Sequence, residues 1–183
     1  MKRQPLLTLL RHYLPIDATE RQMWQDTLVF VETQPHCFER WLLPGHITGS
    51  AWIIDPTRQC ALLMHHRKLD RWFQPGGHAD GATDVRQVAF KEATEETGLA
   101  AIQPIGTTIF DIDVHLIPAR PEMPAHLHYD IRFLFEANAS VPLLGNHESK
   151  AVRWIQLEEI ENYNNSDSIL RMVNKVLKMR DLQ

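Results

Sequence analysis

The spacing of apolar residues changes at Gly45, and this change limits the fold that the chain can adopt. Before Gly45 apolar residues recur at helical spacing, and after it they form the short runs and alternations typical of strands. Residues 51–54 and 60–64 flank Asp55-Pro56, which predicts a hairpin. One helix, from about Asp84 to Thr97, interrupts the strands. Strands mixed with a central helix and terminal helices predict an α/β layered domain.

The first 44 residues predict a small helical extension. Its first helix has leucines at helical spacing and ends before Pro15, and a second helix is predicted from about Thr19 to Thr33. The leucines are Leu6, Leu7, Leu10 and Leu14. We expect residues 1–44 to pack on the core of a domain formed by residues 45–183, which closes with a helix from about Asp167 to Met179.

The central helix is well bounded but chemically unusual. Asp84, with Gln87 three residues later, predicts an N-cap, and Gly98 is a natural residue to follow the last turn. Glutamates at i, i+3 and i+4 crowd one face of that turn, where the helix dipole disfavours negative charge. They are Glu92, Glu95 and Glu96. Magnesium favours oxygen ligands, so a divalent cation would turn this unfavourable cluster into a coordination site.

A glycine-rich loop precedes this helix. Gly76 and Gly77 are expected to end a short strand, and Gly81 follows shortly after. Glycines let a backbone approach another group closely, so the loop is suited to aim a carbonyl at a metal or its amides at a phosphate.

The run from Gly77 to Leu99 resembles the Nudix box, Gly-x5-Glu-x7-Arg-Glu-U-x-Glu-Glu-x-Gly-U, where U is apolar. The positions that match in register are Gly77, Glu92, Ala93, Glu95, Glu96, Gly98 and Leu99. The resemblance implies a Nudix-type α/β/α sandwich with a mixed β-sheet, here preceded by the N-terminal helical extension. The domain of residues 45–183 would then be a Nudix hydrolase domain.

The resemblance also implies the site. Glu92, Glu95 and Glu96 would bind Mg²⁺ or Mn²⁺, with a backbone carbonyl at Gly76 or Gly77 assisting. Metal ions would neutralise a diphosphate and lower the pKa of the attacking water, and a carboxylate would take its proton. Glu92 or Glu95 is a candidate for this base, and so is Glu148, in a loop before the last strand. The alternative is that Glu148 is an exposed loop residue without a catalytic role.

Two positions depart from the family pattern. Thr83 stands where the family has a glutamate, and Lys91 stands where it has an arginine. In the family this pair forms a salt bridge that braces the loop against the helix. We interpret the change as an altered brace, with Asp84 available to face Lys91, and it leaves the catalytic rate and metal affinity open.

Two further strands carry a polar face that the box does not explain. In residues 109–116 and 126–133, aspartates, histidines and an arginine alternate with apolar residues, and the proline-rich connector suggests an antiparallel hairpin. One strand would contribute Asp111, Asp113 and His115, and the other His126, His128, Asp130 and Arg132.

Three interpretations of this face remain open. The first is the solvated side of a half-buried sheet, and the second is a surface that lines the substrate. The third is a transition-metal site formed by His126, His128 and Asp130. In the second case His126, His128, Asp130 and Arg132 bind substrate, together with His78 of the glycine loop. The Gly-Gly-His-x-Asp-Gly loop and the His-x-His-x-Asp strand resemble those of a Nudix subgroup. This resemblance does not identify the substrate.

Composition limits the partners. The net charge of −4 gives no reason to expect binding to a nucleic acid polymer, and no apolar run is long enough to span a membrane. Cys37 and Cys60 lack the spacing of a disulfide framework or zinc ribbon, which fits the cytoplasm. The expected partner is a small diphosphate or nucleotide substrate. A homodimer is compatible with the family resemblance.

The favoured function is metal-dependent hydrolysis of the phosphoanhydride bond in a nucleoside diphosphate linked to another moiety. The alternative is a Nudix-fold nucleotide-binding or regulatory domain without hydrolysis, which Thr83 and Lys91 favour slightly and the intact glutamates disfavour. An isomerase resembling isopentenyl-diphosphate isomerase is a third hypothesis. It expects an active-site cysteine, and neither cysteine here has the expected setting.

Overall fold

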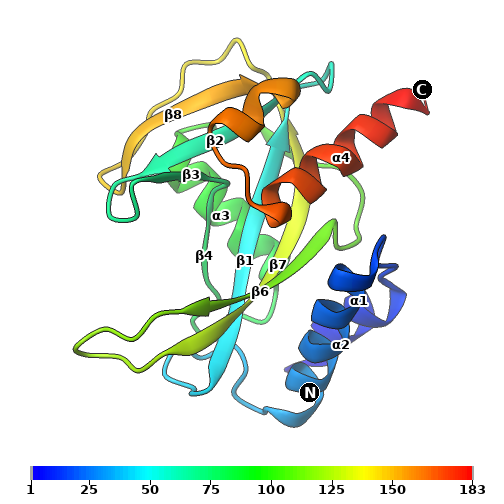
Figure 1. Cartoon of the computed structure of the whole chain (residues 1–183), viewed down its shortest axis with the longest axis vertical. Helices are drawn as coiled ribbons and strands as arrows, with labels where there is room; N and C mark the ends of the chain where they lie inside the picture. The colour runs from blue at the N-terminus through cyan, green and yellow to red at the C-terminus, as the bar shows by residue number, and fades with distance from the viewer. Residues whose placement is uncertain (1, 183) are drawn as a thin grey trace. The chain divides into compact units, whose positions relative to one another are not determined.

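The computed structural model describes residues 2–182 of the chain (Figure 1). Its helices are α1 (Gln4–His12), α2 (Ala18–Thr33), α3 (Val85–Thr97) and α4 (Asp167–Asp181), with the 3-10 helix η1 (Leu157–Asn162). Its strands are β1 (Gly45–Ile54), β2 (Cys60–His66), β3 (Arg71–Phe73), β4 (Gly76–His78), β5 (Ile102–Pro104), β6 (Asp111–Ile117), β7 (His126–Ala137) and β8 (Ser149–Gln156).

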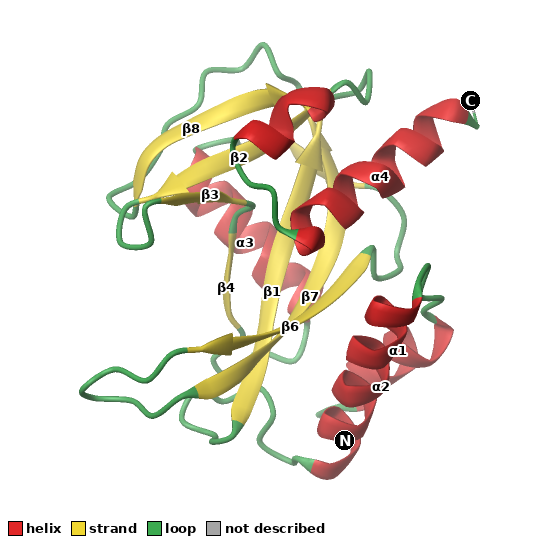
Figure 2. Ribbon diagram, viewed as in Figure 1, coloured by secondary structure: helices red, strands yellow, loops and turns green. Residues whose placement is uncertain are grey.

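The strands of the described chain pair in the order β3-β2-β1-β7-β5, with β4 on β1, β6 on β7 and β8 on β2 (Figure 2). This is the expected α/β fold with a mixed sheet and flanking helices. Residues 2–182 form two compact units. Unit 1 comprises residues up to 50, 76–89 and 107–133, and unit 2 comprises residues 51–75, 90–106 and 134 onward.

Most predicted elements are present, with one correction in the glycine loop. The hairpin at Asp55-Pro56 and the antiparallel β6–β7 pair are confirmed. Gly76 and Gly77, however, do not end the preceding strand, which stops at Phe73. They form a strand of their own, β4, which pairs with β1. The short elements β5 and η1 were not predicted, because three to six residues give too few periods to recognise.

In unit 1, the N-terminal helices pack against each other and, through α2, against β6. The fully buried Glu20 of α2 accepts hydrogen bonds from the Tyr13 hydroxyl and, at 2.8 Å, from the Ile16 amide. Burial of a carboxylate is costly unless it is hydrogen-bonded, so these contacts fix the connection between the two helices. The division of the chain at residue 44 stays a prediction.

Unit 2 has its own apolar core, centred on β2. This strand lies between β3 and β8, and α4 packs against η1. Buried apolar side chains of this unit include Trp52, Leu62, Leu63, Ile155, Ile160, Met172 and Val176. Among residues 2–182, no helix combines the length and apolar character needed to cross a membrane. Both cysteines are free, Cys37 buried and Cys60 half-buried.

A buried ion network joins β1, β6 and β7 within unit 1. Arg132, which is 3% exposed, forms ion pairs with Asp111, Asp113 and Asp130 at 3.1, 3.3 and 2.8 Å. Asp130 also accepts hydrogen bonds from Thr48 and Ser50 of β1, each at 2.8 Å. Burial alone would lower the pKa of Arg132, but the three aspartates outweigh it and raise the pKa above its ordinary value.

We expect Arg132→Met to destabilise the fold by about 3–5 kcal/mol, because it leaves buried carboxylates without their cation. The matched control is Arg11→Met, which removes an exposed arginine paired with Glu32 at 3.0 Å and should cost no more than about 1 kcal/mol. Urea unfolding of both variants measures the difference. Equal losses in the two variants would contradict a stabilising role of the network.

Candidate functional site

The acidic end of α3 forms as its sequence predicts. The Asp84 carboxylate accepts a hydrogen bond from the Gln87 amide at 3.1 Å, which confirms the N-cap. At the other end, the Gly98 amide donates to the Thr94 carbonyl, and Gly98 has a φ of 71°, a conformation that favours glycine. The capped helix therefore holds its glutamates at fixed positions in the last two turns.

The glutamates differ in burial. Glu96 is 4% exposed, Glu92 is half-buried, and Glu95 is exposed and ion-paired with Lys91 at 3.0 Å. A buried carboxylate near the negative end of a helix dipole is unfavourable unless cations or donors compensate it. Oxygen ligands on one helix face suit magnesium or manganese, so this donor set fits the divalent metal that the family resemblance implies.

An altered brace, with Asp84 facing Lys91, stays a prediction, and the contact shown for Lys91 lies within α3. Lys91, in the place of the family's arginine, pairs with Glu95 of the same helix. Thr83, in the place of the family's glutamate, carries no charge. A salt bridge of the family's kind therefore cannot form between Thr83 and Lys91, because threonine carries no charge.

Strand β4 requires glycine at its first position. Gly76 lies opposite Ser50 of β1, and a Cβ atom at Gly76 would come within 2.9 Å of the Ser50 Cα. Ser50 hydrogen-bonds Asp130, so this side chain cannot move without disturbing the ion network. The close approach holds the Gly76–His78 segment directly against β1.

The polar side chains predicted on two strands form one face with others from β1 and β4, which we call the polar face. Asp111, Asp113 and His115 of β6 lie opposite Arg132, Asp130 and His128 of β7. His46, Thr48 and Ser50 alternate along β1, and His78 of β4 lies opposite Thr48. Since Asp111, Asp130 and Arg132 are buried, the polar face is not a solvated sheet surface.

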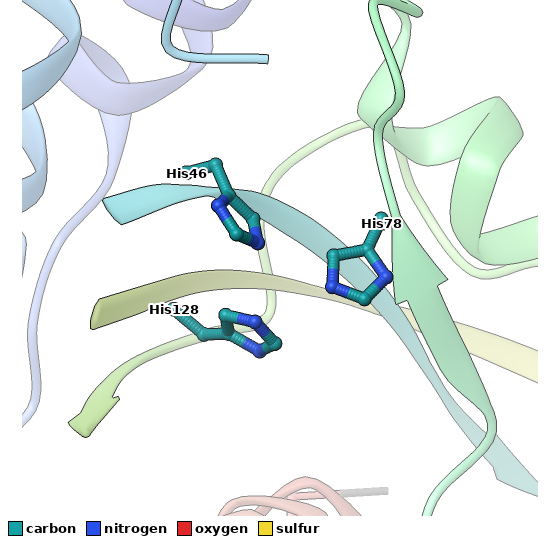
Figure 3. Close-up of side chains that lie close together, drawn as sticks. All are labelled: His46, His78 and His128. Atoms are coloured by element: carbon teal, nitrogen blue, oxygen red, sulfur yellow. The ribbon is translucent and has the colours of Figure 1, made fainter. Parts of the chain in front are cut away.

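His46, His78 and His128 meet on the polar face and are called the histidine cluster (Figure 3). Their ring centroids are 5.0 Å apart for His46–His78, 4.8 Å for His46–His128 and 5.0 Å for His78–His128. One ring nitrogen from each lies within 4.8 Å of the others. His126 and His115 stand beside the cluster, with ring centroids 5.3 and 5.5 Å from that of His128.

Burial lowers the pKa of the three rings of the histidine cluster and favours their uncharged form at neutral pH. It is the largest cause that lowers the pKa of His46 to about 4 and of His128 to about 2, and charge on neighbouring histidines adds to it. The pKa of His78 is also lowered, first by burial and then by Arg40. Neutral imidazoles keep a lone pair available.

Sequence reasoning missed His46. It placed His78, His126 and His128 as substrate contacts but did not use the first half of β1, where the signal was present. His46, Thr48 and Ser50 alternate with Ile47, Gly49 and Ala51, the same two-residue period as in β7.

Glu148 lies in a small basic pocket of unit 2. The pocket is lined by His66, Arg67, Lys68, His147 and Glu148. The Arg67 amide donates to the Glu148 carbonyl at 2.8 Å, and the Arg67 side chain donates to the carbonyls of His147 and Ser149. These bonds hold the loop before β8 to the turn after β2. The Glu148 side chain is 52% exposed and accessible to a ligand.

A family-level comparison matches residues 44–173 to the NUDIX domain, which is most of the chain. The chain belongs to the Nudix family. This membership supports the predicted enzyme class, a Nudix hydrolase that acts on pyrophosphate bonds. A search of curated proteins found no match.

Solved Nudix structures share the fold at low identity. A Caenorhabditis elegans Ap4A hydrolase in a binary complex aligns with a TM-score of 0.60 and 16% identity, covering 75% of this chain and 98% of that one. A NUDIX family hydrolase from Clostridium perfringens gives 0.55 and 22%, covering 73% and 97%. The Escherichia coli dihydroneopterin triphosphate pyrophosphohydrolase gives 0.55 and 13%, covering 70% and 92%.

The lowered histidine pKa values predict a loss of stability in acid. Between the ordinary pKa of about 6.5 and the folded value of about 4 for His46, the unfolded chain binds more protons than the folded one. Stability therefore falls as the pH falls through this window, by up to about 1.4 kcal/mol per pH unit for each such group. Urea unfolding at several pH values with a chelator present measures the slope. His128→Gln should flatten it, and a slope of the opposite sign would contradict this account.

Proposed function

We propose that this Nudix-family protein is a metal-dependent hydrolase that cleaves the phosphoanhydride bond of a nucleoside diphosphate linked to another moiety. The observation that carries the proposal is the set of Glu92, Glu95 and Glu96 at the end of a capped helix, in register with the family box. Nudix hydrolases generally use divalent metals, and these carboxylates fit Mg²⁺ or Mn²⁺.

The roles follow from the donor set. Glu92, Glu95 and Glu96 would hold the metal, which when bound would supply charge neutralisation and a lowered pKa for the attacking water. The contribution of the Gly76 backbone stays a prediction. Glu92, Glu95 or Glu148 accepts the proton from that water. The exposed position of Glu95 and its ion pair with Lys91 are compatible with either binding or proton transfer.

The basic pocket supports an anion-binding role for the loop of Glu148. His66, Arg67 and Lys68 line it beside Glu148, and cationic or hydrogen-bonding side chains of this kind recognise phosphate oxygens. A general base next to such a subsite would accept a proton from a water molecule beside the bound phosphate chain.

The polar face is proposed to contact substrate through its histidines. His78 and His128 are half-buried and retain some access to solvent, whereas His126, Asp130 and Arg132 are buried. Asp130 and Arg132 are buried and ion-paired with each other at 2.8 Å. Their direct contact with substrate stays a prediction.

A binding domain without hydrolysis is the competing function. The replacement of the family's brace by Thr83 and Lys91 is the observation that favours it. An unbraced loop would lower catalysis more than nucleotide binding, because catalysis depends on sub-ångström placement of the reacting groups.

We expect Glu95→Gln and Glu96→Gln each to lower turnover by about 100-fold or more, because each removes a metal ligand and, for Glu95, a candidate base. The assay measures release of phosphate or nucleoside monophosphate from nucleotide sugars, dinucleotides, nucleoside triphosphates and coenzyme A, with magnesium or manganese.

The control for this series is Glu161→Gln, an exposed glutamate in η1, which should retain full turnover. Metal-independent turnover would contradict the proposed mechanism. Tight nucleotide binding without any turnover in the wild type would replace it with the binding-domain function.

Glu148→Gln tests the proposed base separately. If Glu148 takes the proton from water, we expect kcat to fall by about 10²–10⁴-fold, and the acidic limb of the pH–rate profile to disappear. An unchanged kcat and pH profile would assign proton transfer to Glu92 or Glu95.

A further inference from the structure

The histidine cluster has a chemistry that the Nudix box does not use. It shares no residue with the carboxylates of α3, and it offers nitrogen ligands where the box offers oxygen. Its three members come from separate strands, β1, β4 and β7, yet their rings gather around one point (Figure 3).

Buried ring nitrogens of the cluster lack hydrogen bonds. Both nitrogens of His46, which is 1% exposed, and Nε2 of His128 are buried without a hydrogen-bond partner in the described chain. The Leu42 carbonyl interacts with the His46 ring, but not at hydrogen-bond geometry. A buried polar atom left unsatisfied is costly and uncommon in native proteins, and a cation that binds one nitrogen of each ring would satisfy up to two of these three atoms.

We propose that His46, His78 and His128 bind a transition-metal cation of the zinc class, at a site separate in its ligands from the carboxylate site. One nitrogen of each ring would then bind the metal, including atoms that otherwise remain unsatisfied.

The spacing of the rings fits this role. Three imidazoles on one tetrahedral zinc, with Zn–N of about 2.05 Å, have ring centroids about 5.2 Å apart and nitrogens about 3.3 Å apart. The observed centroids are 4.8–5.0 Å apart, and the ligand nitrogens lie within 4.8 Å of one another. The ring centroids are therefore close to the separation that a shared zinc requires, and binding would bring the nitrogens from within 4.8 Å to about 3.3 Å of one another.

The ligand set also selects the metal. Imidazole suits zinc, copper, iron and nickel, whereas magnesium prefers oxygen ligands and a retained water shell. Three protein ligands leave the fourth tetrahedral position open, as in zinc sites that bind water or a substrate atom. Around the site, His115 contacts the His128 ring and is itself held by Asp113 at 2.9 Å. Such outer contacts orient metal-binding histidines.

The test is metal binding by the whole chain, measured without reference to activity. Protein stripped with a chelator is dialysed against Zn²⁺ in excess Mg²⁺, and its zinc content is measured by mass spectrometry. Co²⁺ is then added in place of Zn²⁺, because the visible spectrum of cobalt reports the ligand geometry. We expect about one zinc per chain and a tetrahedral cobalt spectrum, as three nitrogen ligands and one water in the open fourth position would give.

Four variants locate the site. His78→Asn and His128→Gln alter half-buried rings and should weaken zinc binding by more than about 100-fold, which exceeds the effect of losing an outer contact. His147→Gln, at a side chain that is 90% exposed, and Glu95→Gln should retain zinc. Circular dichroism verifies that each variant is folded.

Two results would overturn the proposal. One is wild-type protein that retains no zinc. The other is zinc that persists in folded His78→Asn and His128→Gln but is lost in Glu95→Gln, which would place it on the carboxylates of α3. Neither result depends on whether the chain hydrolyses a nucleotide, so failure of this proposal is distinct from failure of the proposed function.

Discussion

The ion network around Arg132 is the interaction on which unit 1 depends. One buried guanidinium compensates Asp111, Asp113 and Asp130, which fixes the register of β6 on β7. Asp130 extends the network to β1 through Thr48 and Ser50. Because side chains alternate along a strand, this register also sets the histidines of β1 and β7 side by side on the polar face.

The chain presents two donor sets of different chemistry. The box supplies carboxylates on consecutive turns of one helix, a set that capping by Asp84 and Gly98 fixes locally. The histidine cluster depends on the pairing of three strands, and on the close approach of Gly76 to Ser50 that holds β4 against β1. Oxygen ligands favour magnesium and nitrogen ligands favour zinc, so the two sets need not compete for a metal.

The sequence predicted what local chemistry determines. The caps of α3, the hairpin at Asp55-Pro56 and the alternating strands follow from residues a few positions apart, and all three are present. The histidine cluster could be predicted only in part, because its members lie far apart in the sequence and meet only when their strands pair. His78 and His128 stood out in their own segments, but nothing in the sequence showed that β1 would lie between them. The same limit explains why the burial of Arg132 was not anticipated, since an arginine is seldom buried without charged partners.

This Nudix domain is proposed to break a phosphoanhydride bond. Phosphorus-31 NMR of a nucleotide sugar or dinucleotide incubated with the wild-type chain and Mg²⁺ observes that bond directly. We predict that the diphosphate resonances are replaced by those of two phosphate monoesters, and that a chelator stops the change. Diphosphate resonances that broaden on binding but persist would contradict the claim and show a domain that holds its ligand intact.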